Sequence, residues 1–147
     1  MLRKILKYVL FGSFSDKKLY FKAFVWSMFT RFLMIYIPFK FYRKYLGEMQ
    51  QLNSFQATES QLQEAIEIKN KVLTVCKNTP WESKCLVQAV TCKQILLKKG
   101  IHTNLYLGVW KDELESEMKA HAWLKLGDVI LTGKHGHQKF KVVNFFG

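Results

Sequence analysis

The chain has 147 residues, of which 49% are hydrophobic and 15% aromatic, so it can bury the core of one domain. Its 2 prolines and 8 glycines exclude collagen-like and low-complexity classes. Lysine and arginine number 23 against 11 acidic residues, and the resulting formal charge of +12 favours an anionic partner: nucleic acid, a membrane surface or an acidic peptide.

The cysteine content points to a reducing compartment. Cys76, Cys85 and Cys92 are odd in number and lack the spacing of a disulfide framework, and no CxxC pair indicates a zinc ribbon. We therefore expect reduced thiols in a cytoplasmic protein.

Two apolar stretches near the N-terminus raise the question of targeting. Residues 1–12 are basic and then apolar, but lysines interrupt the run and no small-residue cleavage site follows, so we expect no secretory signal. The stretch Phe21–Phe39 contains Lys22 and Arg31 and is closed by Pro38, which favours a buried or interfacial helix over a membrane span.

The composition divides the chain into a basic, aromatic-rich helical segment with a linker at residues 1–57 and a second domain at residues 58–147. In the first part, Ser15 and Asp16 are candidate N-caps for a helix from about Lys17 to Tyr36. A short helix follows at residues 39–46 and ends at a glycine, and residues 49–57 have the composition of a polar linker.

The second part begins with two helices. Thr58 and Gln61 form a capping-box pattern for a helix that reaches Cys76 or Lys77. After a turn at residues 78–81, a further helix should start at Glu82 or Ser83 and run to about residue 99, with Cys85 in its first turn.

The hydrophobic period then changes from helix to strand. Alternation predicts strands at residues 101–110, 120–126, 129–132 and 140–145, separated by a charged loop at 112–118, a tight turn at 127–128 and a Gly/His loop at 133–138. Helices followed by consecutive strands indicate an α+β fold with a small antiparallel sheet.

Cys85 and His121 are the candidates for chemistry. A cysteine at a helix N-terminus is favoured as thiolate, and the free N–H groups of the first turn, that of Cys85 above all, can bind an oxyanion. A histidine at the start of a strand can act as general base and then as acid toward a leaving amine. Any single cysteine can instead be a small buried core residue with no chemical role, and we assign that structural role to Cys92 and Cys76.

Other residues admit two interpretations each. Trp81 either lines a substrate channel or packs the turn against the helix, and Trp123 is a second channel candidate. His135 and His137 lack a flanking ligand, so a loop role is favoured over a metal site, and no metal or cofactor is expected. The acidic residues at 112–117 form a solvated loop or contact a basic partner.

The basic, aromatic N-terminal region can serve as core together with a partner-docking surface, or as a peripheral membrane attachment. Its apolar residues recur with helical spacing. No nucleic-acid reading motif is present, so we expect no nucleic acid partner.

Several ordered motifs resemble one known family. The segments are Pro80–Leu86 (PWESKCL), Ile95–Ile101 (ILLKKGI), Leu105–Val109 (LYLGV) and Ala120–Leu124 (AHAWL). They resemble the lasso-peptide biosynthesis leader peptidases, transglutaminase-like cysteine proteases that form the peptidase half of the lasso B protein. The resemblance covers about residues 78–147 and extends less specifically to the helices before residue 47.

The resemblance implies a function and partners. It implies a stand-alone leader peptidase with a transglutaminase-like, papain-like fold, in which Cys85 is the nucleophile and His121 the general base. Such a protein cuts the leader from a ribosomal precursor peptide that a small recognition protein presents, and a separate cyclase then closes the core. The alternatives are another acyl-transfer enzyme on the same scaffold, such as a transglutaminase or amidase, and a non-catalytic maturation scaffold.

The third member of the family's triad is not matched. An Asp is expected on the strand after the histidine strand, where this chain has Thr132 or Gly133. Asp128 falls in the turn, roughly 15 Å or more from His121 at about 3.3 Å per residue. A hairpin that pairs Leu126 with Val129 places residue 133 or 134 beside the histidine, so we expect a Cys–His dyad oriented by a hydroxyl, an amide, a backbone carbonyl or another loop.

Overall fold

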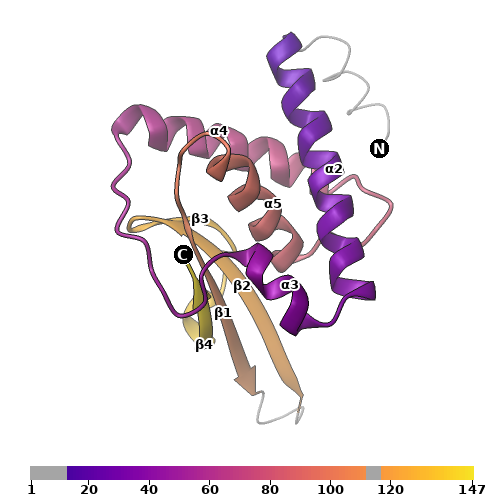
Figure 1. Cartoon of the computed structure of the whole chain (residues 1–147), viewed down its shortest axis with the longest axis vertical. Coiled ribbons are helices and arrows are strands. Elements are labelled where there is room, and N and C mark those ends of the chain that lie inside the picture. Colours follow the sequence, from indigo (N-terminus) through magenta and orange to yellow (C-terminus); the bar gives the residue numbers. More distant parts are fainter. Residues whose placement is uncertain (1–12, 112–116) are drawn as a thin grey trace.

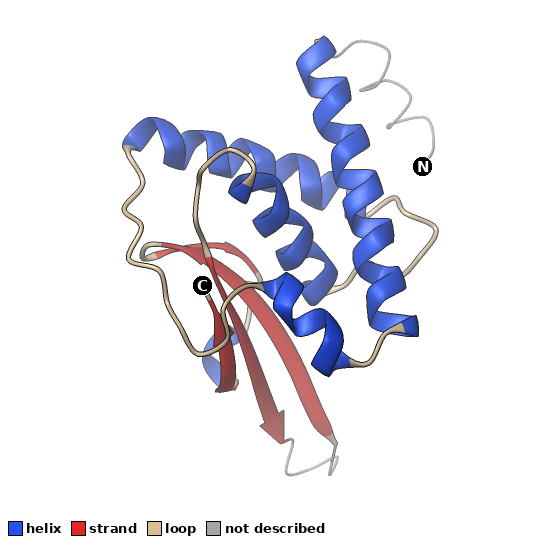
Figure 2. Ribbon diagram, in the orientation of Figure 1, coloured by secondary structure: helices blue, strands red, loops and turns tan. Residues whose placement is uncertain are grey.

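A computed structural model describes residues 13–111 and 117–147 of the chain. The expectations for residues 1–12 and for the acidic loop at 112–116 lie outside these ranges. The described chain is an α+β fold in which helices cover one face of a four-stranded antiparallel sheet (Figure 1, Figure 2). The predicted fold class and the succession of helices and strands are thereby confirmed.

The helices begin and end at residues that satisfy their terminal groups, and they are α2 (Phe14–Tyr36), α3 (Phe39–Leu46), α4 (Glu59–Cys76) and α5 (Cys85–Leu97). The prediction for the start of α2 is wrong by three residues. Ser13, not Ser15 or Asp16, is the N-cap, and its Oγ accepts a hydrogen bond from the backbone N–H of Asp16 at 3.3 Å.

The capping box of α4 is confirmed. The Thr58 hydroxyl accepts from the Gln61 N–H at 3.3 Å, and the Gln61 side chain accepts from the Thr58 N–H at 3.0 Å. These two bonds satisfy donors that a helix start otherwise leaves free.

The strands are β1 (Asn104–Lys111), β2 (Met118–Leu126), β3 (Val129–Thr132) and β4 (Lys141–Phe146), with a short 3-10 helix, η1 (His137–Lys139), before β4. Their order in the sheet is β3-β2-β1-β4. The last strand therefore passes β3 and β2 to pair with β1, an arrangement that alternation along the sequence does not specify.

One core runs through the described chain. Ala23 of α2 and Leu46 of α3 belong to the same buried cluster as residues of α4, α5 and the sheet. Residues 49–57 run along the sheet: Gln50 N–H donates to the Phe145 carbonyl at 2.8 Å, and Asn53 Nδ2 donates to the Thr103 carbonyl at 3.1 Å. The segment with the composition of a linker is thus tied to strand ends by hydrogen bonds.

Of the helices described, none combines the length and apolarity that crossing a membrane requires.

Candidate active site

The turn before α5 places Cys85 as the first residue of that helix. Sequence reasoning began this helix at Glu82 or Ser83, but Thr79 Oγ1 lies 2.8 Å from the Ser83 hydroxyl and Gln88 Nε2 donates to the Ser83 carbonyl at 2.9 Å. These bonds hold the chain in a turn through Ser83. Lys84 is the N-cap and contributes no capping side chain, so the first-turn N–H groups beside Cys85 have no side-chain cap.

The three thiols differ in accessibility. Cys76 and Cys92 are buried, and burial raises the pKa of Cys76 to about 11 and that of Cys92 to about 12. The expectation that both belong to the core is confirmed. Cys85 is partly exposed, so it is the thiol that a substrate can reach.

His121 lies on β2 and is held by the chain that follows β3. Its Nε2 lies 2.8 Å from the carbonyl oxygen of Gly133. A carbonyl can only accept, so Nε2 carries the proton and Nδ1 is left as the basic nitrogen. Leu126 pairs with Val129 as expected, and position 133 does reach the histidine. The sequence left open whether a hydroxyl, an amide, a backbone carbonyl or another loop orients His121. In the structure the backbone carbonyl of Gly133 does so.

The side chain of Phe140 adds a second constraint on the imidazole. The two ring centroids lie 4.9 Å apart. Phe140 follows η1, so the loop between β3 and β4 supplies both the hydrogen-bond acceptor and the packing surface of His121.

A cavity of about 410 Å³ lies between the start of α5 and the middle of the sheet, and both Cys85 and His121 border it. Its other walls are mainly apolar: Met34, Leu86, Val87, Leu107, Val109, Ala120, Ala122 and Val143. Charged side chains lie at its rim, where Arg31 pairs with Glu82 at 3.1 Å. A hydrogen bond from Lys84, together with Arg31, lowers the pKa of Glu82.

The thiol and the imidazole lie on different faces of the sheet, although residue His121 borders this cavity. Ala122 packs in the core beneath α5. His121 pairs directly with Gly108, and a Cβ on Gly108 would touch Trp123 and Phe140, which places His121 with those rings on the opposite face. No hydrogen bond joins the side chains of Cys85 and His121, both of which are described.

The two tryptophan candidates do not line the Cys85 cavity, although the ring centroid of Trp123 lies 6.0 Å from that of His121. Trp81 packs against Phe24 of α2 with ring centroids 4.9 Å apart, and Trp123 stacks on Tyr106 at 5.7 Å. Asp128 is exposed in the β2–β3 turn, and Thr132 is buried.

The two histidines of the β3–β4 loop are not part of a metal-binding group. His135 is exposed, and His137 Nδ1 lies 2.7 Å from the Lys134 carbonyl. Within residues 13–111 and 117–147, no group of three or more histidine, cysteine or acidic side chains is arranged to hold a metal ion.

Sequence reasoning missed the contribution of α2 to the cavity. Arg31 and Met34 line it although they precede Cys85 by some fifty residues in the chain. Their spacing of three places them on one face of α2, but only the packing of that helix on α5 shows which partner this face meets.

The architecture is that of an α+β protein in which a helix that begins with a cysteine packs on an antiparallel sheet that carries a histidine. A model of the transglutaminase-like superfamily matches residues 33–144, so the chain belongs to that superfamily. The superfamily includes cysteine-based acyl-transfer and protease enzymes. No curated protein and no solved structure matches the chain significantly.

Proposed function

We propose that this protein is a cytoplasmic cysteine peptidase that removes the leader from a ribosomally made lasso-peptide precursor. The observation that carries the proposal is the position of Cys85, the accessible thiol, at the first residue of α5 on an apolar cavity that His121 also borders. Superfamily membership and the ordered motifs around both residues support it.

Each group has a role in the reaction. Nδ1 of His121 takes the proton of the Cys85 thiol, and the sulfur attacks the carbonyl carbon of the last leader residue. The N–H groups of the first turn of α5 stabilise the oxyanion. The C–N bond then breaks as the imidazolium protonates the leaving amine. Water, deprotonated by the same nitrogen, attacks the thioester and releases the leader carboxylate and the free thiol.

This chemistry needs a rearrangement around the imidazole. Nδ1 can accept the thiol proton only when the ring faces Cys85, and His121 rests on the other face of the sheet against Phe140. Successive side chains of a strand point to opposite faces, so the ring can face Cys85 only after β2 twists or shifts locally at His121. The proposal therefore requires that binding of the peptide, with the presenting protein in place, drives this local change in β2.

The test is cleavage of a cognate precursor in the presence of its presenting protein, read by mass spectrometry. We expect a leader fragment with wild type and none with Cys85→Ala or His121→Gln, while His102→Gln, an exposed histidine outside the cavity, retains activity. Cleavage that persists in Cys85→Ala would overturn the proposal. The product mass also separates hydrolysis, which adds water, from transfer of the acyl group to an amine.

One observation favours a second candidate, a non-catalytic maturation scaffold. The side chains of Cys85 and His121 are not hydrogen-bonded to each other in the structure, and the same would hold for a scaffold whose cysteine has no catalytic role. Alkylation by iodoacetamide distinguishes the two candidates. With the precursor and the presenting protein present, Cys85 of an enzyme should be alkylated faster than free cysteine at the same pH, whereas Cys85 of a scaffold should show no such enhancement. Cys76 and Cys92 should react only on unfolding, since both are buried.

A further inference from the structure

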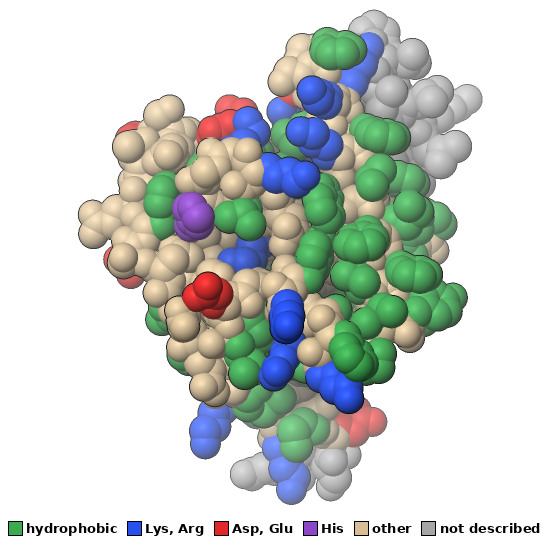
Figure 3. Space-filling model, viewed as in Figure 1, with side chains coloured by type: hydrophobic (Ala, Val, Ile, Leu, Met, Phe, Trp, Pro, Cys, Tyr) green, Lys and Arg blue, Asp and Glu red, His purple; other side chains and the backbone are tan. Residues whose placement is uncertain are grey.

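The outward face of α2 is apolar from Phe21 to Tyr36. Its inward face carries the buried residues Ala23, Ser27 and Thr30. The opposite face exposes a large apolar side chain in each turn from Phe21 onward: Phe21, Val25, Met28, Phe29, Phe32, Ile35 and Tyr36. Phe14, at the start of the helix, is also exposed. These sixteen residues from Phe21 to Tyr36 extend about 23 Å at 1.5 Å per residue, so the ridge is much larger than the single exposed apolar side chains that are normal on a protein surface. Figure 3 shows hydrophobic side chains gathered along the right side of the molecule, where α2 lies in Figure 1.

Cations border this aromatic ridge. Between residues 13 and 47, Asp16 is the one acidic side chain, and it is paired with Lys71. The same stretch carries seven basic residues: Lys17, Lys18, Lys22, Arg31, Lys40, Arg43 and Lys44. A ridge that is apolar at its centre and basic at its margin is complementary to a surface that is apolar inside and anionic outside.

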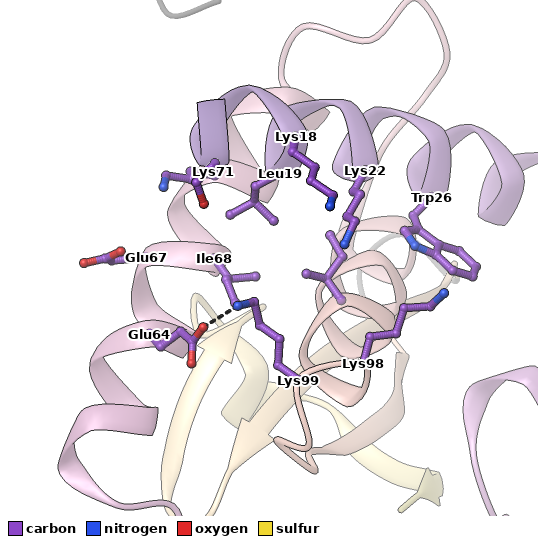
Figure 4. Close-up of a pocket in the computed structure, with 12 residues that line it drawn as sticks. Lys18, Leu19, Lys22, Trp26, Glu64, Glu67, Ile68, Lys71, Lys98 and Lys99 are labelled. Atoms are coloured by element: carbon purple, nitrogen blue, oxygen red, sulfur yellow. Dashed lines mark hydrogen bonds and ion pairs between the residues drawn. The ribbon is translucent and has the colours of Figure 1, made fainter. Parts of the chain in front are cut away.

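A basic groove lies beside the ridge, between α2, α4 and the end of α5. It has a volume of about 350 Å³, and five lysines line it together with Glu64 and Glu67. In Figure 4 Lys18 and Lys22 come from α2, Lys71 from α4, and Lys98 and Lys99 from the chain just after α5.

The lysines of this groove are not all neutralised. Lys71 pairs with Asp16 and Lys99 with Glu64. Lys98 Nζ lies 5.2 Å from the centre of the Trp26 ring, and Lys18 and Lys22 have no acidic partner within the described part of the chain. Three cations therefore remain for an anionic group, above a floor that includes Leu19 and Ile68.

We propose that the α2 ridge and the adjoining lysine groove dock the protein on an anionic lipid bilayer. The helix lies in the plane of the interface with Phe21 and Phe32 in the acyl boundary, about 5–10 Å deep, and the groove lysines contact lipid phosphates. This goes beyond the proposed peptidase activity, because it assigns the protein to a surface whatever reaction Cys85 performs.

The experiment is flotation of the full-length protein with two kinds of vesicle, pure phosphatidylcholine and an equimolar mixture with phosphatidylglycerol. We expect binding to the anionic vesicles that weakens as salt is added. The triple variant Lys18→Gln/Lys22→Gln/Lys98→Gln should lower the partition coefficient roughly a hundredfold, because each cation at an anionic surface contributes about fivefold. A matched triple variant on the sheet side, Lys111→Gln/Lys134→Gln/Lys141→Gln, should bind like wild type.

A second pair of variants tests the apolar ridge. Phe21→Gln/Phe32→Gln should lower binding about tenfold or more per residue. Their side chains are 69% and 51% exposed, and Met118 and Leu52, also 69% and 51% exposed, provide the matched control Met118→Gln/Leu52→Gln. Circular dichroism checks that each variant is folded.

Three outcomes would overturn the proposal. They are failure of the wild type to float with anionic vesicles, equal loss in the test and control variants, and self-association that the phenylalanine variants abolish without any vesicle binding. The third outcome would assign the ridge to a second copy of the chain. The Cys85→Ala variant should float like wild type, so the result does not depend on the proposed peptidase activity.

Discussion

Lys93 is a buried lysine whose removal should stabilise the fold at neutral pH. Its side chain is 5% exposed within α5, and its Nζ donates to the Thr103 carbonyl at 2.6 Å. Desolvation by burial lowers the pKa of Lys93 from 10.5 to about 8. At pH 7 the native state therefore holds an ammonium in an apolar site, which costs about 3 kcal/mol relative to the neutral amine at about 1.36 kcal/mol per pKa unit.

Lys93→Met removes that cost together with one hydrogen bond. The Thr103 carbonyl is not orphaned, because Asn53 Nδ2 also donates to it at 3.1 Å. Subtracting about 1 kcal/mol for the lost bond leaves a gain of about 2 kcal/mol in the free energy of unfolding at pH 7.

The gain should depend on pH with a definite sign. The native-state pKa lies below the unfolded one, so between about pH 8 and pH 10.5 the unfolded wild type binds more protons and its stability rises with pH. The advantage of Lys93→Met should therefore shrink across this window and become a deficit of about 1 kcal/mol above it.

Urea unfolding of both proteins at a series of pH values measures this difference. The difference between variant and wild type is the quantity to follow, because the raised pKa values of Cys76 and Cys92 lower the stability of both proteins above pH 9. A Lys93→Met protein less stable than wild type at pH 7, or a difference that does not change with pH, would refute the reasoning.

Two further substitutions probe the histidine loop and the helix cap. Gly133→Ala should be destabilising by clearly more than Gly127→Ala: both have positive φ, but a Cβ at 133 would lie 2.3 Å from the Ala122 carbonyl oxygen, whereas nothing lies within 4 Å at 127. Urea midpoints measure the stability of both variants. Equal losses of stability would contradict the reasoning, because they would show that the contact between the new Cβ at 133 and the Ala122 carbonyl oxygen costs nothing. Thr58→Ala should lower stability by about 1 kcal/mol, because it removes the acceptor for the Gln61 N–H, and an unchanged midpoint would contradict that role of the cap.

Local patterns were sufficient for most elements of this fold. The Thr58–Gln61 spacing located the start of α4, Gly47 the end of α3, and the Leu126–Val129 turn the β2–β3 hairpin. Such signals depend on residues within a few positions of one another, so they are legible without the rest of the structure. The same hairpin placed residue 133 beside His121, and with it the carbonyl that orients the ring.

The side of the sheet that His121 faces was also legible in the sequence. Ala122, Leu124 and Leu126 alternate as core residues along β2, and His121 lies out of phase with them. This alternation predicts that the imidazole of His121 lies on the sheet face opposite to α5 and the Cys85 thiol. The motif around both residues led instead to the expectation of a formed dyad, whose two members the structure brings to one cavity but does not join.

The sequence by itself determined the succession of helices, the β2–β3 hairpin and the place of Cys85 in the first turn of a helix, because each depends on short-range capping, turn chemistry or hydrophobic periodicity. Tertiary structure alone decided that β4 pairs with β1, that residues 49–57 are tied to strand ends, and that Arg31 and Met34 of α2 line the Cys85 cavity. Those contacts join residues far apart in the chain, and their free energy arises from packing that no local pattern encodes.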